Sequence, residues 1–366
     1  MKIAYFVLDK TDYLSPNNEL KQANFFANYG AEVFLYTEGR IDYENWDKSE
    51  NLHLIQIPIV SHVLNQKKLS EEEWKLITDN KVDIIFASAI SASELVNEVK
   101  KRMNIPSVVQ ILDIPIFRLK YQEYWNQWKV WLKYITKSDL IIVNTRRCAD
   151  DLHNIFNGAL DYKIKLVYYG IDDPLCNSIQ EQEKKYDICA VGRLVFYKYF
   201  DVLIYALAEL KEQGINPKTV IIGGGEDAFR LWETTLNTGV DIEFVGAVGD
   251  EEKFKIIKQS RIGVCPDSCV SIGSLFPAEA MYCGLPTIIT NMPINKERFG
   301  DTPIYFKMFH IHDLAEKIKQ TLDNCYYEAR GNEFIMKNRL FKHTAQGILT
   351  EINKIIENEK MLNATK

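Results

Sequence analysis

Short apolar runs alternate with amphipathic stretches through the first half of the chain. We interpret the apolar runs as buried strands, at Ile3–Leu8, Ala31–Tyr36, Val82–Ala87, Ser107–Leu112, Leu140–Val143 and Ile164–Tyr168. The stretches between them have helical spacing, at Glu19–Tyr29, Glu71–Thr78, Ser91–Met103 and Tyr121–Thr136. Strands that alternate with helices predict a parallel sheet with helices on both faces.

The same alternation restarts after the polar stretch 172–185, which we interpret as a linker. Strands are predicted from Ile188 and at Val220–Ile222, Ile242–Val245, Ile262–Cys265 and Thr287–Ile289. Helices are predicted at Asp201–Gln213, Ala228–Thr238, Glu251–Gln259, Phe276–Cys283 and His312–Asn324. A chain of 366 residues has room for two domains. We therefore predict domains at 1–171 and 186–332, followed by a helical segment at 333–366.

Composition narrows the class of protein. The net charge of -6 does not suggest a nucleic-acid partner, and 46% hydrophobic residues are ordinary for a globular protein. Seven cysteines without a C-x-x-C pair indicate reduced thiols, so we expect a cytoplasmic protein. The first residues turn polar too soon for a signal peptide, and no apolar run approaches the ~20 residues that span a bilayer.

Two basic residues follow the first strand of the second half. Arg193 and Lys198 lie across a turn that leads into a helix. Positive charge is unfavourable at the start of a helix, so an anionic partner accounts for them better than solvent exposure does. Two fixed cations at that turn suit a diphosphate leaving group, whose charge grows as its bond breaks.

Glycines and one acid mark neighbouring turns. Gly223, Gly224 and Gly225 end a buried strand, where they either let the backbone approach a ligand or simply make a tight turn. The pattern G-x-G-x-x-G is absent, so this turn is not a dinucleotide fingerprint. Glu279 lies in the first turn of a predicted helix, where it either accepts hydrogen bonds from ribose hydroxyls or complements the helix dipole.

Four segments in this order resemble the retaining glycosyltransferases of family 4. They are Gly192-Arg193-Leu194 with Lys198 and Asp201, Gly223-Gly-Gly-Glu226, Asp241–Gly246 with Asp250-Glu-Glu252, and Glu279-Ala-Met281 with Gly284-Leu-Pro286. The resemblance implies the glycosyltransferase-B fold, in which two facing Rossmann-like domains form an interdomain cleft. It also implies that the second domain binds a nucleotide-diphosphate sugar, that the first binds the acceptor, and that the final helix crosses back to the first.

The resemblance also assigns roles to residues. Arg193 and Lys198 would stabilise the leaving diphosphate and Glu279 would hold the ribose, with no metal and no cofactor besides the donor substrate. The other donor-binding residues it implies are Gly192, Gly223, Gly224, Gly225, Gly246, Ala247, Val248, Gly273, Ser274 and Leu275.

The sequence departs from the family at several positions. Ser271 stands where the family has the first acid of its acid pair, and Asp267 is a nearby candidate to replace it. The first loop has no glycine pair, although Asn17 and Asn18 could imitate its left-handed turn. No histidine follows the fourth predicted strand, where Asp113 either contacts the sugar or acceptor as a catalytic residue or stabilises a turn.

Trp125, Trp128 and Trp131 accompany lysines on one predicted helix. They either meet the inner membrane face, which would suit a lipid-linked acceptor, or pack against the first sheet, which we favour. We predict a retaining hexosyltransferase of glycan biosynthesis that acts on a glycan, lipid-linked or protein acceptor and binds no nucleic acid. The alternatives are a non-catalytic nucleotide-sugar-binding partner subunit and a sugar-nucleotide epimerase of the same fold.

Overall fold

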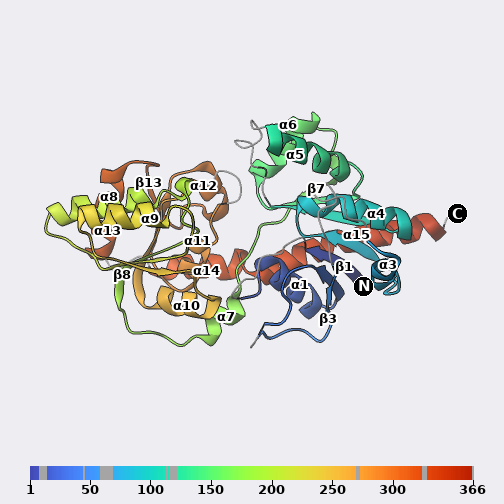
Figure 1. Cartoon of the computed structure of the whole chain (residues 1–366), viewed down its shortest axis with the longest axis horizontal. Coiled ribbons are helices and arrows are strands. Elements are labelled where there is room, and N and C mark those ends of the chain that lie inside the picture. Colours follow the sequence, from blue (N-terminus) through green and yellow to red (C-terminus); the bar gives the residue numbers. More distant parts are fainter. Residues whose placement is uncertain are drawn as a thin grey trace. The chain divides into compact units, whose positions relative to one another are not determined.

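The chain folds into two compact α/β units (Figure 1). The computed structural model describes residues 1–7, 15–43, 46–57, 69–112, 114, 122–268, 273–323 and 328–364. One unit comprises Met1–Tyr169 with Phe341–Lys366, and the other comprises Gly170–Leu340. Each unit has its own parallel sheet, of seven and six strands, so the predicted fold class is confirmed.

The sheet of the first unit has the strand order β3-β2-β1-β4-β5-β6-β7. Its strands are β1 (Lys2–Val7), β2 (Glu32–Thr37), β3 (Leu52–Gln56), β4 (Ile84–Ala87), β5 (Ser107–Ile111), β6 (Leu140–Val143) and β7 (Ile164–Leu166). All neighbouring strands run parallel, and Tyr5 of β1 pairs with Leu35 on one side and Phe86 on the other. The edge strand β3 was not predicted, because it is half-exposed and lacks a continuous apolar run.

Helices cover both faces of this sheet (Figure 1). They are α1 (Asn18–Asn28), α3 (Glu71–Thr78), η1 (Ile90–Ala92), α4 (Ser93–Met103), α5 (Gln122–Ile135), α6 (Arg146–Phe156), η2 (Asp161–Lys163) and α15 (Phe341–Ala364). Trp128 and Trp131 of α5 are buried in the core and pack edge to face. The favoured interpretation, packing against the first sheet, is therefore confirmed for these two, and of the three tryptophans only Trp125 is exposed.

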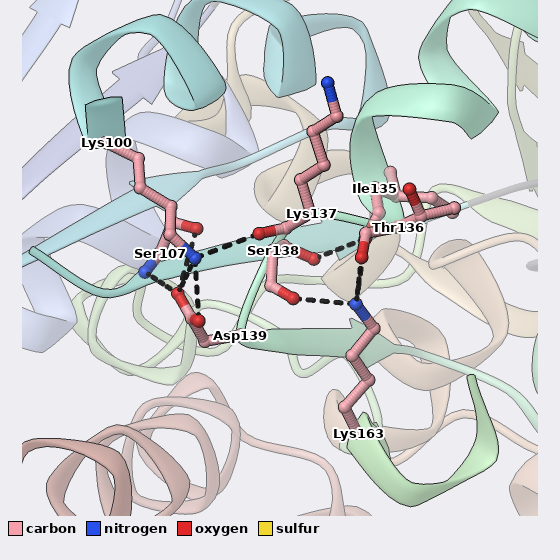
Figure 2. Close-up of polar contacts among 8 residues, drawn as sticks. All are labelled: Lys100, Ser107, Ile135, Thr136, Lys137, Ser138, Asp139 and Lys163. Atoms are coloured by element: carbon pink, nitrogen blue, oxygen red, sulfur yellow. Dashed lines mark hydrogen bonds and ion pairs between the residues drawn. The ribbon is translucent and has the colours of Figure 1, made fainter. Parts of the chain in front are cut away.

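Hydrogen bonds and an ion pair stabilise the amino-terminal ends of β5 and β6 (Figure 2). The carboxylate of Asp139 accepts hydrogen bonds from Lys100 Nζ at 2.6 Å and from the backbone N–H of Ser107 at 2.7 Å. Lys163 Nζ donates to the carbonyls of Thr136 and Ser138, both at 2.7 Å. These contacts lie opposite the strand ends where parallel sheets bind ligands, so we assign them to stability.

The sheet of the second unit has the order β10-β9-β8-β11-β12-β13. Its strands are β8 (Tyr186–Val191), β9 (Thr219–Ile222), β10 (Ile242–Gly246), β11 (Ser260–Cys265), β12 (Thr287–Thr290) and β13 (Ile304–Phe306). Its helices are α7 (Asp173–Ser178), η3 (Phe196–Lys198), α8 (Phe200–Glu212), α9 (Ala228–Thr238), α10 (Asp250–Lys258), α11 (Phe276–Tyr282), α12 (Pro293–Phe299), α13 (Ile311–Asp323) and α14 (Glu328–Asn338).

The segment 172–185, predicted as a linker, belongs to the second unit. Asp172 caps α7, and the side chains of Cys176 and Ile179 are buried in the core of that unit. Most residues of this segment are polar, so its sequence did not indicate that Cys176 and Ile179 are buried. The chain returns to the first unit between Leu340 and Phe341, beyond the predicted boundary at 333.

Helix α15 packs against α1 within the first unit. Ile348 and Ile352 are fully buried in the core that α1 and the sheet share with this helix. Among the described helices, none combines the length and apolarity that crossing a bilayer requires.

Candidate functional site

The predicted donor-binding residues follow the carboxyl ends of four strands in the second unit. Strands β8, β9, β10 and β11 end at Val191, Ile222, Gly246 and Cys265. These strands are neighbours in a parallel sheet, so their ends meet at one edge, where open α/β sheets bind ligands. The structure thereby brings the predicted turns together.

The glycine turn after β9 interlocks with the turn after β8. A Cβ on Gly223 would lie 1.9 Å from the carbonyl oxygen of Gly192, and one on Gly225 would lie 2.3 Å from that of Leu194. Leu194 N–H donates to the carbonyl of Gly224 at 2.8 Å, and Gly223 N–H donates to that of Gly246 at 2.8 Å. Close backbone packing therefore requires Gly223 and Gly225, whatever the turn binds.

Lys198 forms an ion pair that was not predicted. It ends η3, and its Nζ lies 2.7 Å from Asp267 Oδ2 in the loop after β11. The two side chains are 14% and 5% exposed, so the pair is largely buried. Thr290 Oγ1 donates to the carbonyl of Asp267 at 2.8 Å and fixes its backbone. Lys198 is therefore held by a carboxylate at the predicted phosphate end of the site.

Arg193 differs from Lys198 in its surroundings. Its side chain is exposed, and Nη2 donates to the hydroxyl of Tyr197 at 2.8 Å. The guanidinium keeps four further N–H groups, because it carries five in all. Arg193 is thus the more accessible of the two predicted cations.

Glu279 belongs to a cluster of three charged side chains. It lies in the first turn of α11, 8% exposed, with Oε1 2.7 Å from Lys253 Nζ. Lys253 also lies 2.8 Å from Asp250 Oδ1, one turn earlier on α10. Burial alone would lower the pKa of Lys253, but the two carboxylates raise it above its ordinary value. Lys253 is therefore a charged partner of Glu279 that the sequence motifs did not reveal.

The loop before α11 is held by an arginine from another helix. Arg298 of α12 is 5% exposed, and its Nη1 donates to the carbonyl of Ser274 at 2.7 Å. Gly273 has φ +68°, and a Cβ there would lie 2.3 Å from the same nitrogen. Leu275 is the N-cap residue that precedes α11, and its side chain makes no capping hydrogen bond. The sequence did not predict a role for Arg298. Helix α12, which carries it, is too short to give a clear helical pattern.

Several predictions concern other parts of the chain. Asp113 and Ser271 lie outside the described residues, so their roles stay predictions. The left-handed turn proposed for Asn17 and Asn18 is wrong, because Asn17 has φ -67° and caps α1, accepting a bond from Leu20 N–H at 2.9 Å. Within the described residues, no group of three or more His, Cys, Asp or Glu side chains is placed to hold a metal ion.

A family model matches the second unit, and one curated protein matches about half of the chain. Residues 174–339 match the model described as glycosyl transferases group 1. The D-inositol 3-phosphate glycosyltransferase of Corynebacterium aurimucosum is 27% identical over 213 residues, which cover 52% of this chain and 50% of that protein. The match thus spans half the length of this relative.

Solved structures resemble the chain over nearly its whole length. Sucrose-phosphate synthase from Thermosynechococcus elongatus is 13% identical, with a TM-score of 0.75 and coverage of 98% of this chain and 99% of that one. Anabaena Alr3699/HepE in complex with UDP and glucose is 15% identical, with a TM-score of 0.74 and coverage of 96% and 99%.

A glycosyltransferase from Rickettsia africae ESF-5 is 16% identical, with a TM-score of 0.75 and coverage of 98% and 99%. At such low sequence identities the structural likeness shows the fold alone. The family model adds which kind of domain residues 174–339 resemble. The fold that the resemblance implies is thereby confirmed: the chain has the glycosyltransferase-B fold, and residues 174–339 of its second unit match the model of group 1 glycosyl transferases.

Proposed function

We propose that this protein transfers a sugar from a nucleotide-diphosphate sugar to an acceptor hydroxyl with retention of anomeric configuration. The observation that carries the proposal is the gathering of Arg193, Lys198 and the interlocked glycine turns at one edge of the second sheet, with Glu279 on the helix after β11. Cations suit the diphosphate, tight turns suit the base and ribose, and the carboxylate suits the ribose hydroxyls. The similar Anabaena protein was solved in complex with UDP and glucose, which supports a nucleotide-sugar donor.

The chemistry needs charge stabilisation at the leaving group. The bond between the anomeric carbon and the diphosphate oxygen breaks, and the acceptor oxygen bonds to the same face of the sugar. The acceptor proton passes to the leaving diphosphate. Arg193 and Lys198 then stabilise the charge that develops on the phosphate oxygens, which is the main contribution we assign to side chains.

Retention and the acceptor come from the family resemblance. The acceptor, a glycan, a lipid-linked saccharide or a protein, would bind to the first unit, and the reaction would take place in the cytoplasm. Asp113 is the candidate contact to the sugar or acceptor. No metal or further cofactor is part of this proposal.

Nucleotide binding is the first test. Purified full-length protein is titrated with UDP, GDP and ADP by calorimetry, and we expect one nucleotide to bind more tightly than the others. Arg193→Ala should weaken that binding about tenfold or more, because a charge-assisted contact to phosphate is lost. Arg261→Ala is the matched control, since Arg261 is an exposed arginine of β11 paired with Asp187 away from these turns. If none of the nucleotides binds at millimolar concentration, the donor-site assignment is wrong.

Turnover separates the enzyme from its alternatives. The sugar nucleotide of the preferred base is incubated with the protein, and release of the nucleoside diphosphate is followed with and without added saccharide acceptors. Release with an α-linked product from an α-linked donor supports retaining transfer, and a β-linked product contradicts it. Interconversion of the sugar on the intact nucleotide would indicate an epimerase. Binding with no release under any condition would indicate a non-catalytic partner subunit.

A further inference from the structure

Lys253 links two helices at the candidate nucleoside end of the site. Its side chain is 16% exposed, and its Nζ contacts Asp250 Oδ1 at 2.8 Å and Glu279 Oε1 at 2.7 Å. Asp250 lies on the same helix, whereas Glu279 lies 26 positions away on α11. The contact therefore depends on the fold and not on helical spacing alone.

The charges in this cluster do not cancel. Two carboxylates share one ammonium, so the cluster carries a formal charge of -1. A lysine is rarely buried unless it is paired, and Asp250 already supplies a partner within one turn. Lys253 therefore has a charged partner without Glu279. We attribute the further contact to its effect on the orientation of the Glu279 carboxylate.

The two helices joined by this contact both lie next to residues that we assign to nucleoside binding. Helix α10 follows Gly246, Ala247 and Val248, the turn predicted to frame the base and ribose, and α11 carries Glu279 in its first turn. A glutamate held at one carboxylate oxygen presents its other oxygen in a fixed direction. Such fixing removes the cost of ordering a flexible side chain when the ligand binds.

We propose that Lys253 is a positioning residue for the donor nucleoside: by holding Glu279 Oε1 it aims the carboxylate at the ribose hydroxyls, and so makes the site selective for ribonucleotides over deoxyribonucleotides. This inference rests on the proposed function. Lys253 touches neither the sugar nor the diphosphate in this assignment, and its effect passes through Glu279.

The test compares each ribonucleotide with its 2′-deoxy counterpart. Dissociation constants of UDP, GDP, ADP, dUDP, dGDP and dADP are measured by calorimetry with the full-length protein. For the base that binds, we expect the wild type to prefer the ribonucleotide about tenfold or more, because a site built to bond a hydroxyl rejects a ligand that lacks it. Lys253→Met should bring this ratio close to one, by weakening the ribonucleotide more than the deoxyribonucleotide, which keeps only its 3′-hydroxyl.

Matched variants separate positioning from general damage. Lys255→Met removes a lysine from the same helix whose side chain is 39% exposed and paired with Glu251, and it should leave the ratio unchanged. Lys253→Arg keeps a cation and should restore part of the selectivity. Lys253→Gln is closer to lysine in polarity, so it replaces Lys253→Met if the methionine variant fails to fold, and it should also lower the ratio.

The binding measurements test the role of Lys253 and the proposed function separately. A ratio in folded Lys253→Met or Lys253→Gln equal to that of the wild type overturns the inference and leaves nucleotide binding intact. An equal loss of affinity for both nucleotides also overturns it, because Lys253 would then support the fold of the site and not the aim of Glu279. If no nucleoside diphosphate binds the wild type, the proposed function itself fails.

Discussion

Lys198 Nζ lies 2.7 Å from Asp267 Oδ2, and both side chains are largely buried. The pair joins residues 69 positions apart at the carboxyl end of the second sheet. A cation proposed to stabilise a diphosphate is therefore already paired with a carboxylate. That carboxylate opposes the approach of an anion, which leads to a specific expectation for its removal.

Asp267→Asn should tighten the binding of nucleoside diphosphates. The variant keeps the Lys198 ammonium and a side chain of the same shape, but it removes one negative charge next to the predicted phosphate position. We expect a gain of about three- to tenfold in affinity for the preferred diphosphate at low salt, and a smaller gain in high salt.

Calorimetry with the diphosphate and the matching monophosphate measures this gain. The monophosphate serves as the control, because it carries less charge and should gain less. Weaker diphosphate binding in Asp267→Asn would contradict the expectation and indicate that the carboxylate fixes Lys198 in its binding position.

The sequence predicts the strands of the second unit closely where they are buried on both faces. Val220–Ile222 was predicted and β9 spans Thr219–Ile222, because a short continuous apolar run between turn residues is typical of a fully buried strand. Helix α3 was predicted with its observed bounds, and it begins with a capping box between Ser70 and Glu73 that fixes its start.

Half-exposed elements were harder to predict. Strand β3 at Leu52–Gln56 and helix α7 at Asp173–Ser178 both mix buried and exposed positions over a short length. Neither gives a clear period, so the first was missed and the second was interpreted as a linker. Their burial depends on neighbours that the sequence does not reveal.

The candidate site shows a similar division. Glu279 and the glycine turns stood out because motifs mark them, whereas the partners of the charged residues did not. Lys253 and Arg298 make their contacts across 26 and 24 positions, and no local spacing predicts such pairs. Motifs thus identify groups that could meet a ligand, and the fold reveals what holds those groups in place.

Lys163→Met should destabilise the first unit. Lys163 is 4% exposed, and its ammonium donates to three carbonyls at the end of α5, those of Ile135, Thr136 and Ser138 (Figure 2). The substitution leaves these carbonyls without their donor in a buried place, and we expect a loss of about 3 kcal/mol in the free energy of unfolding.

Urea denaturation followed by circular dichroism measures that loss. Lys165→Met is the control, because Lys165 is an exposed lysine on the adjacent strand β7. A loss no larger than that of the control would show that the three hydrogen bonds contribute little.

His312 should titrate above its ordinary pKa. A hydrogen bond from its Nδ1 to Glu209 Oε1, at 2.5 Å, and the charge of that carboxylate raise the pKa of His312 from 6.5. A group whose folded pKa is raised adds stability that is fully present below its unfolded pKa and is lost as the pH rises through the folded value. The contact between α8 and α13 should therefore weaken as the pH rises above 6.5.

Proton NMR of the His312 ring follows this titration directly. Glu209→Gln should return the pKa towards 6.5, whereas Glu316→Gln, which removes a weaker charge on the same helix, should change it little. An unchanged pKa in Glu209→Gln would contradict the assigned cause.

Cys176 and Cys283 should form a disulfide under mild oxidation. Their Sγ atoms lie 3.2 Å apart, Cys176 on α7 and Cys283 at the end of α11, and both are free thiols. The hydrogen bond from Cys283 lowers the pKa of Cys176, which favours the thiolate that starts the exchange. Diamide would take up two electrons and two protons as the two thiols join, and the bond would tie α7 to the helix that carries Glu279.

Thiol counting and peptide mapping after diamide treatment measure this reaction. We expect the wild type to lose two free thiols to a Cys176–Cys283 bridge and to unfold at a higher temperature, because a loop of about 100 residues is closed in the unfolded chain. Cys283→Ser should lose no such pair under the same treatment. A wild type that keeps both thiols reduced would contradict this prediction. It would show that the packing around α7 prevents the two sulfur atoms from moving from 3.2 Å to bonding distance.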